Sequence, residues 1–269
     1  MDRFIGKVAI VTGSTQGLGE AIVLRFAAEG ASGIVVCGRN AERGEAVAES
    51  VRGLGADAIF VPVELGDLDS VAALVAESDG HFGRVDILVN AAALTDRGSI
   101  VDTTPDLWDT LLNVNTRAPF FLMQHVIRIM RRERIAGTIV NIGSLASHGS
   151  VPMLAPYAVS KGALVAMTRN VAYAMARDHI RVNTLNLGWM DTPGEDAIQR
   201  TYHGADESWL AEAEAAMPFG RLLKPDEVAR AVAFLASGDS GMMTGAIVDF
   251  DQSVLGGGMQ PVISPEDIP

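Results

Sequence analysis

The sequence has a single cysteine, Cys37, among its 269 residues, so no disulfide can form within the chain. An isolated thiol is typical of proteins from a reducing compartment. The first seven residues contain no apolar core of a signal peptide, and no uninterrupted apolar run is long enough to span a bilayer. These absences argue against a disulfide-stabilised scaffold and a membrane protein, and we expect a cytoplasmic protein.

Basic residues are scarce relative to acids: 21 Lys and Arg stand against 33 Asp and Glu, for a formal net charge of -12. An acidic chain is repelled by phosphate backbones and anionic lipid surfaces, so we expect neither nucleic acid nor a membrane as its main partner. Hydrophobic residues (48%) and glycine (28 residues) are abundant, which suits a compact globular enzyme with many tight turns. We therefore expect a small-molecule substrate, and we assign no metal ligand.

Short apolar runs alternate with amphipathic helical patterns along nearly the whole chain. The expected strands are residues 7–12, 33–38, 58–63, 86–90, 137–141, 180–186 and 246–251. The expected helices are residues 20–29, 41–54, 67–82, 104–132, 156–177 and 225–236. This alternation predicts an α/β fold with one Rossmann-type, doubly wound parallel sheet of about seven strands.

No repeat or linker divides the chain, so we expect a single domain over residues 1–269. Residues 192–218 show no strand pattern and are expected to form a lid over the substrate. The tail, residues 253–269, is rich in glycine and proline and is expected to form no element of its own.

A glycine-rich loop, residues 13–19, joins the first expected strand to the first expected helix. Backbone N–H groups and the helix dipole make such a helix start an anion site, and glycine allows close approach of a pyrophosphate. A flexible turn is the simpler explanation of glycines alone, but the position between strand and helix favours dinucleotide binding. The candidate cofactor ligands in this loop are Gly13, Thr15, Gln16, Gly17, Leu18 and Gly19.

Arg39 directly follows the second expected strand, where an NAD-type site would carry an acid for the ribose diol. A guanidinium at this point suits a 2′-phosphate, so we favour NADP(H) and keep NAD(H) as possible. The alternative is that Arg39 is a solvated residue before the helix at 41–54.

Tyr157 and Lys161 lie four residues apart, just after Pro156, which suits the first turn of a helix. On one helix face, the ammonium of Lys161 is expected to lower the pKa of the Tyr157 phenol. Ser144 follows a strand, where its hydroxyl can share a carbonyl oxygen with that phenol. Taken alone, the pair is better explained as two ordinary surface-helix residues, with Ser144 as a turn former.

Pro119 falls inside the expected helix at 104–132. Proline has no N–H to donate to the carbonyl of Asn115 four residues earlier, so that carbonyl is expected to be free for a water or a polar group.

These residues together resemble the short-chain dehydrogenase/reductase family over nearly everything from Lys7 to about Asp251. Residues 12–19 match that family's Thr-Gly-x-x-x-Gly-x-Gly loop. Asn115, Ser144, Tyr157 and Lys161 fall on its catalytic tetrad, with thirteen residues from Ser144 to Tyr157.

The resemblance implies a role for each position. Tyr157 would be the general acid/base and Ser144 would polarise the substrate oxygen. Lys161 would lower the tyrosine pKa and bind the nicotinamide ribose, and Asn115 would hold a water of a proton relay. Further implied cofactor contacts are Glu64, Leu65, Asn90, Gly188 and Thr192. The implied substrate contacts are Ser144, Leu145, His148, Tyr157 and Trp189, with a solvated loop histidine as the alternative for His148.

The sequence departs from the family at several places without losing a catalytic group. Residues 90–93 read Asn-Ala-Ala-Ala in place of Asn-Asn-Ala-Gly, and Leu187 replaces the usual proline before Gly188. Glu64 stands for the usual acid after the third strand, and residues 251–253 read Asp-Gln-Ser in place of Asp-Gly-Gly. These changes affect the nicotinamide pocket and the substrate class.

We therefore expect an oxidoreductase that moves a hydride between a nicotinamide cofactor and a small secondary alcohol or ketone. Acids, amides and aromatics in residues 192–218 favour a sugar or polyol, although the same residues would suit the wet face of an amphipathic helix. The alternatives are a 3-ketoacyl-thioester reductase, a non-catalytic dinucleotide-sensing regulator, and an enzyme of elimination without cofactor. The resemblance and the apolar residues at 104–132 and 156–177 also predict a homotetramer.

Overall fold

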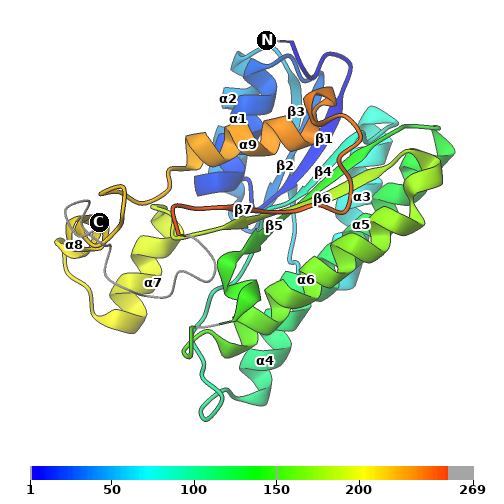
Figure 1. Ribbon diagram of the computed structural model, residues 1–269. Coiled ribbons are helices and arrows are strands. Elements are labelled where there is room, and N and C mark those ends of the chain that lie inside the picture. Colours follow the sequence, from blue (N-terminus) through cyan, green and yellow to red (C-terminus); the bar gives the residue numbers. More distant parts are fainter. Residues whose placement is uncertain (1, 150, 254–269) are drawn as a thin grey trace, which may run out of the picture.

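A seven-stranded parallel sheet forms the centre of the molecule, in the order β3-β2-β1-β4-β5-β6-β7 (Figure 1). The computed structural model describes residues 2–149 and 151–253. The strands are β1 Val8–Thr12, β2 Gly33–Gly38, β3 Asp57–Pro62, β4 Ile87–Asn90, β5 Thr138–Ser144, β6 Arg181–Leu187 and β7 Ile247–Phe250. All seven predicted strands are present, which confirms the doubly wound α/β fold.

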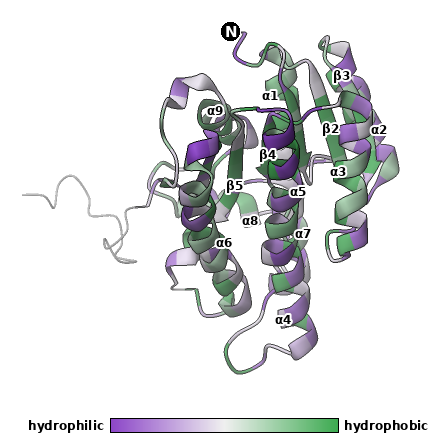
Figure 2. Ribbon diagram, turned by 90° about the vertical axis from the view of Figure 1, so that its right-hand side faces the viewer, coloured by the Kyte–Doolittle hydropathy of each residue, from purple (hydrophilic) through white to green (hydrophobic). Residues whose placement is uncertain are grey.

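Helices cover both faces of the sheet, as parallel strands require. They are α1 Gly17–Ala28, α2 Ala41–Gly53, α3 Leu68–Phe82, α4 Pro105–Leu112, α5 Ala118–Arg132, α6 Ala155–Ala174, α7 Pro193–His203, α8 Trp209–Ala215 and α9 Pro225–Ala236. One buried cluster joins α1, α2 and α9 to the sheet, and a second joins α3 and α5 to the opposite face. The strands are almost uniformly hydrophobic, whereas the outer helices alternate between polar and apolar residues (Figure 2).

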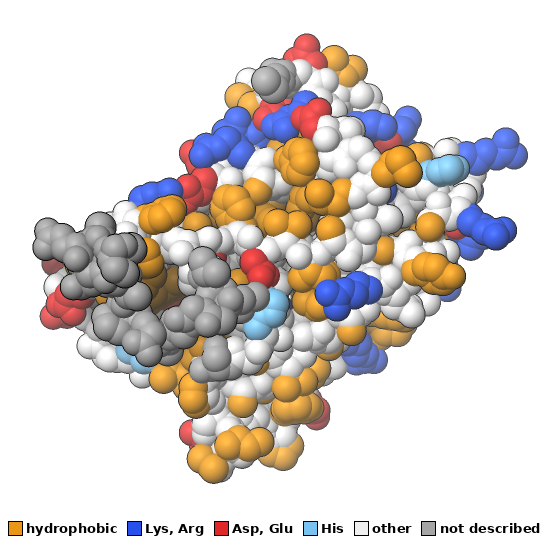
Figure 3. Space-filling model, viewed as in Figure 1, with side chains coloured by type: hydrophobic (Ala, Val, Ile, Leu, Met, Phe, Trp, Pro, Cys, Tyr) orange, Lys and Arg blue, Asp and Glu red, His pale blue; other side chains and the backbone are white. Residues whose placement is uncertain are grey.

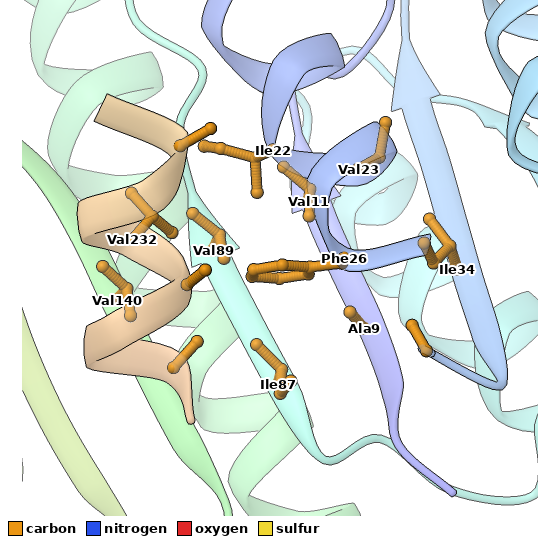
Figure 4. Packing of buried hydrophobic residues seen from close by; sticks show 14 of the residues in the cluster. Ala9, Val11, Ile22, Val23, Phe26, Ile34, Ile87, Val89, Val140 and Val232 are labelled. Carbon is orange, nitrogen blue, oxygen red and sulfur yellow. The ribbon is translucent and has the colours of Figure 1, made fainter. Parts of the chain in front are cut away.

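Phe26 shows how the first of these layers is packed. Its ring lies between the sheet residues Ala9 and Ile87 and the α9 residue Val232, and it is fully buried (Figure 4). Burying a phenylalanine from water contributes roughly 2 to 3 kcal/mol, so this contact fixes α1 and α9 side by side against the sheet.

Strand β1 is the point at which the order of the strands in the sheet reverses: β2 and β3 are added on one side of it, and β4 to β7 on the other. It pairs with β2 on one side and with β4 on the other, so the connections from β1 and β4 leave toward opposite faces. In open α/β sheets the crevice at such a reversal is where ligands bind, at the carboxyl ends of the strands.

The element boundaries differ from the prediction in a few places. Thr104 caps α4, its hydroxyl accepting the N–H of Leu107 at 3.2 Å. The predicted helix 104–132 is interrupted by a π-helical turn at Asn113–Arg117, just before Pro119. Strand β5 runs three residues beyond its predicted end and includes Ser144.

Residues 192–218 fold into two helices, α7 and α8, joined by a short loop. The predicted tail begins at Ser253, and its remainder, residues 254–269, lies outside the described residues. Within the described part of the chain, no helix combines the length and the apolar character needed to cross a membrane.

Candidate active site

A cleft of about 1010 Å³ opens at the carboxyl edge of the sheet, between the loops that follow the strands and helix α7. It brings together most of the residues singled out in the sequence. The predicted residues that line it are Gly13, Thr15, Gln16, Gly17, Leu18, Gly19, Arg39, Glu64, Leu65, Ser144, Leu145, Tyr157, Lys161, Gly188, Trp189 and Thr192. Asn90, Asn115 and His148 are not among the described residues that line it.

The glycine loop lies at one end of this cleft, and two of its glycines are required by close contacts. Gly13 has φ +68°, and a Cβ there would lie 3.0 Å from Ala92 in the loop after β4. A Cβ on Gly19 would collide with the backbone carbonyl of Gly13. The side chain of Gln16 does not cap α1, so the first N–H groups of that helix are available to an anion.

Two arginines lie beyond the glycine loop, at the same end of the cleft. Arg39 follows β2 as predicted, and Arg43 joins it from the first turn of α2. Asn40 caps α2 by accepting the N–H of Arg43 at 2.8 Å. Arg43 was not among the predicted cofactor ligands. The sequence signal that could have found it is Asn40, a capping residue whose position places Arg43 in the first turn of the next helix, beside Arg39.

Tyr157 and Lys161 lie on the first turns of α6, with Ser144 at the end of β5 beside them. Both side chains are buried, Tyr157 being 9% and Lys161 2% exposed. The Lys161 ammonium donates to the carbonyl of Ile142 at 2.8 Å and lies 5.7 Å from the centroid of the Tyr157 ring.

Burial determines the protonation of both groups. It lowers the pKa of Lys161 to about 8 and raises the pKa of Tyr157 above its ordinary value, an effect that a hydrogen bond with Ser144 partly offsets. The sequence predicted that Lys161 lowers the pKa of Tyr157. The pKa is instead raised, because desolvation of the phenol outweighs the hydrogen bond with Ser144 and the charge of Arg97. Tyr157 is protonated at neutral pH and can act as a proton donor.

The Ser144 hydroxyl is oriented by the backbone. Its oxygen accepts the N–H of Ala146 at 3.1 Å. Because that bond uses a lone pair of the oxygen, the hydroxyl proton can be donated to a carbonyl oxygen in the cleft. Ser144 and Tyr157 can thus both donate to one substrate oxygen.

Asn115 lies in the π-helical turn and is 1% exposed. Its side-chain amide both accepts from the N–H and donates to the carbonyl of Leu94, each at 2.9 Å. It also donates to the hydroxyl of Ser160 at 3.1 Å, next to Lys161 in the chain. The amide side chain, rather than the carbonyl that the sequence drew attention to, thus joins the loop after β4 to helix α6.

The predicted cofactor contact at Asn90 is not supported by its position. The side chain is buried below the cleft, and its Nδ2 donates to Oδ1 of Asn141 at 2.8 Å. It ends strand β4 within the sheet, where the neighbouring strand supplies its partner.

His148 does not line the cleft in the described part of the chain. Its Nε2 lies 3.0 Å from a carboxylate oxygen of Asp249 on β7, so the ring is paired across the sheet edge. The alternative prediction, a solvated loop histidine, is also incomplete, because the ring has this fixed partner.

Gly188 is the retained half of the usual Pro-Gly pair. A Cβ there would collide with the carboxylate of Asp251, which also lines the cleft. Asp251, which matches the first residue of the family's Asp-Gly-Gly pattern, can therefore lie at this position only because residue 188 has no side chain.

Two groups of the residues that line the cleft differ in chemistry, and we call them the apolar wall and the polar wall. Apolar side chains from the segment after β5 and from the loop after β4 form one wall: Leu94, Leu145, Val151, Met153 and Leu154. Polar and aromatic side chains from α7 and nearby loops form the other: Thr95, Asp96, Arg97, Trp189, Glu195, Gln199 and His203. The sequence analysis anticipated the α7 residues but missed Asp96 and Arg97, which come from a loop without a recognised motif.

Helix α7 is fastened across the cleft to the loop after β4. The Tyr202 hydroxyl donates to Asp96 at 2.7 Å, and Nε of Arg97 donates to Nε2 of His203 at 3.3 Å. Trp189 stacks on Trp209 of α8, with ring centroids 6.2 Å apart.

Within the described residues, no cluster of three or more His, Cys, Asp or Glu side chains could hold a metal ion.

Comparison with known proteins agrees with this geometry. Residues 13–254 match the family model described as enoyl-(acyl carrier protein) reductase. The chain is 32% identical to a 3-oxoacyl-[acyl-carrier-protein] reductase of Thermotoga maritima, over 93% of this chain and 98% of that protein. It is 36% identical to an NADP-dependent (R)-specific alcohol dehydrogenase of Lentilactobacillus kefiri, over 91% and 95% of the two chains.

Solved structures give the same result. A short-chain dehydrogenase/reductase family protein superposes with a TM-score of 0.81 at 35% identity, covering 94% of this chain and 98% of the other. An actinorhodin polyketide ketoreductase with NADPH superposes with a TM-score of 0.86 at 29% identity, covering 91% and 96%. The chain belongs to the short-chain dehydrogenase/reductase family and is an oxidoreductase acting on CH–OH and C=O groups.

Proposed function

We propose that the protein is an NADP(H)-dependent oxidoreductase whose substrate is a small polar secondary alcohol or ketone, with sugars and polyols ahead of ketoacyl thioesters. The observation that carries this proposal is the polar wall of α7 and the loop after β4, in the same cleft as Ser144, Tyr157 and the glycine loop. NAD(H) remains the alternative cofactor.

The glycine loop fits a dinucleotide. The contacts at Gly13 and Gly19 leave no room for side chains, so the backbone forms a smooth surface beside the free N–H groups of α1. Arg39 and Arg43 provide positive charge at the far end of that surface, where a 2′-phosphate would lie. When bound, the cofactor supplies or accepts the hydride.

Tyr157 and Ser144 both act on the substrate oxygen. In the reductive direction Ser144 donates a hydrogen bond to the carbonyl oxygen, and protonated Tyr157 delivers its proton to the same oxygen. Burial keeps the phenol protonated, because a raised pKa leaves the neutral form dominant at neutral pH. Lys161, buried against Ile142 beside the ring, offers its remaining donors to the ribose end of the cofactor.

Asn115 acts as a positioning residue in this proposal. Its amide fixes both Leu94, on the substrate side, and Ser160, next to Lys161. A rearrangement of this side chain would move the substrate wall and helix α6 together.

The choice of a polar substrate over an acyl thioester depends on desolvation. The carboxylates and amides of the polar wall lose water when a ligand enters, and hydroxyl groups of the ligand restore their hydrogen bonds. A long acyl chain would leave them unpaired on that side. Thioester reduction is the second candidate, because one relative is a 3-oxoacyl-[acyl-carrier-protein] reductase and because the apolar wall of the cleft could contact an acyl chain.

A purely regulatory role is less well supported, because a dinucleotide sensor has no need of Tyr157 and Lys161 buried together at a cleft. An elimination without cofactor is disfavoured by the intact glycine loop.

In the proposed enzyme, helices α7 and α8 form the lid over the substrate, and one domain contains the whole site.

We also propose a cytoplasmic homotetramer. Exposed large apolar side chains on α4, α5 and α6 support it: Trp108, Phe120, Val159 and Tyr173. Hydrophobic side chains also gather at the lower end of the molecule, over α4 and the loop before it (Figure 3).

The substrate class is tested by a kinetic panel of polyols, sugars, ketoacyl thioesters and hydroxysteroids with both cofactors. We expect kcat/KM for at least one sugar or polyol to be about tenfold above that for any thioester or steroid, equivalent to roughly 1.4 kcal/mol in transition-state binding. The reverse order would replace this substrate class by the thioester candidate.

Cofactor choice is tested by Arg39→Ala and Arg43→Ala. Each substitution removes a charge-assisted contact to a phosphate, so we expect KM for NADPH to rise about tenfold or more while KM for NADH changes less than about twofold. Arg52→Ala, at the opposite end of α2, is the matched control and should change neither value. Equal effects on both cofactors would contradict the assignment of NADP(H).

The buried ammonium of Lys161 is tested by Lys161→Met. Because its pKa falls from 10.5 to about 8 on folding, the folded protein binds fewer protons between these values and wild-type stability rises with pH. We expect the free energy of unfolding of wild type, relative to Lys161→Met, to increase by about 2 kcal/mol from pH 7 to pH 10, measured by urea denaturation.

Lys224→Met is the control for that measurement. Its partners Glu214 and Asp191 raise the pKa of Lys224, so its contribution should be nearly constant from pH 7 to pH 10. A Lys161→Met difference that is equally constant would show that the ammonium is not desolvated.

A further inference from the structure

Arg97 and Glu195 face each other across the substrate end of the cleft. Arg97 comes from the loop after β4, and Glu195 from the first turn of α7. Their side chains are 16% and 17% exposed, and Nη2 of Arg97 lies 3.9 Å from Oε1 of Glu195. This separation exceeds the roughly 3.2 Å limit of an N–H···O hydrogen bond. The two charges are therefore near each other but not in direct contact.

Each group is held by other partners. Oε1 of Glu195 accepts from the indole N–H of Trp189 at 2.8 Å and from the amide of Gln199 at 2.7 Å. The Arg97 guanidinium donates to the carbonyl of Thr95 at 2.8 Å through Nη1, besides its contact with His203. The positions of the guanidinium and the carboxylate are thus set before a ligand arrives.

The gap between them selects one kind of chemical group. Oε1 of Glu195 already accepts two hydrogen bonds, whereas Oε2 accepts none from the described residues. A hydroxyl oxygen between the two groups can accept from Nη2 of Arg97 and donate to Oε2 of Glu195. A carboxylate or phosphate would be repelled by Glu195, an ammonium would be repelled by Arg97, and a carbonyl oxygen could not donate to Glu195. A hydroxyl group accepts from Arg97 and donates to Glu195 at once.

We propose that Arg97 and Glu195 form a recognition pair for a second, non-reacting hydroxyl group of the substrate. This inference rests on the proposed function, since it names the feature that would favour a sugar or polyol. Both bonds are charge-assisted and partly shielded from water, which makes them stronger than bonds between neutral groups.

The pair lies close enough to the reaction centre to act on the same molecule. The charge of Glu195 raises the pKa of Tyr157 and the charge of Arg97 lowers it, so both fields reach the phenol. Arg97, Glu195 and Tyr157 also line the same cleft, so a substrate whose carbinol carbon meets Tyr157 can extend another hydroxyl to the pair.

The experiment is a cycle of enzyme variants and substrate analogues. The best polyol or ketose substrate of wild type is compared with its monodeoxy analogues, each lacking one hydroxyl group. We expect one analogue to lose about tenfold or more in kcat/KM with wild type. Glu195→Gln and Arg97→Met should lose a similar factor on the parent substrate and almost nothing further on that analogue. Such coupling reports a direct contact, which a general loosening of the lid would not produce.

Asp196→Asn is the matched control. Asp196 follows Glu195 on α7 but binds Arg200 and the indole of Trp209 instead of lining the cleft. We expect this variant to keep the full deoxy penalty, even if its overall rate falls. Thermal unfolding and NADPH binding confirm that each variant is folded, and Arg97→Met gives an independent result if Glu195→Gln is unstable.

Two results would overturn the inference, and they are distinguishable. If wild type turns over polyols but both variants retain every deoxy penalty, the recognition pair is wrong and the proposed function stands. If wild type turns over no polyhydroxylated compound while reducing thioesters or steroids, the pair and the proposed substrate class fall together.

Discussion

The position of strand β1 constrains the rest of the molecule. Because β1 pairs in parallel with both β2 and β4, the chain leaves its carboxyl end and that of β4 in opposite directions, and a cleft opens between the two connections. The loops must nevertheless pass within contact distance, with Gly13 against Ala92. The cofactor end of the site follows from this contact, since only a backbone without side chains fits at that point and the N-terminus of α1 is brought to the edge of the cleft.

The reaction centre depends on burial as much as on proximity. Lys161 and Tyr157 lie on the first turns of helix α6 with little exposure to solvent. Burial lowers the pKa of Lys161 and raises the pKa of Tyr157, which favours the neutral form of each group. The ammonium of Lys161 donates to the carbonyl of Ile142. The raised pKa of Tyr157 keeps its phenol protonated at neutral pH. Arg39 and Arg43, in contrast, are exposed to solvent at the edge of the cleft, where we propose that they bind a phosphate of the cofactor.

The sequence predicted the strands, the helix faces and the clustering of Ser144, Tyr157 and Lys161, because local apolar patterns and the rules of parallel sheets determine these features. It did not predict the fastening of Arg97 and Asp96 to α7, which depends on how two loops meet across a cleft. Nor did it predict the partners of His148 and Asn90, because these partners, Asp249 and Asn141, come from other strands. The raised pKa of Tyr157 was not predicted either, because a helical spacing does not show how deeply a side chain is buried.

In the proposed mechanism, Tyr157 donates the proton to the substrate oxygen during hydride transfer in this cleft. Tyr157→Phe keeps the ring and removes only the phenolic oxygen, so the role of the phenol is measured by the turnover of this variant together with its affinity for NADPH. We expect kcat to fall by about a hundredfold or more while the Kd for NADPH stays within about twofold of wild type. Retention of more than about a tenth of the wild-type rate would contradict this mechanism.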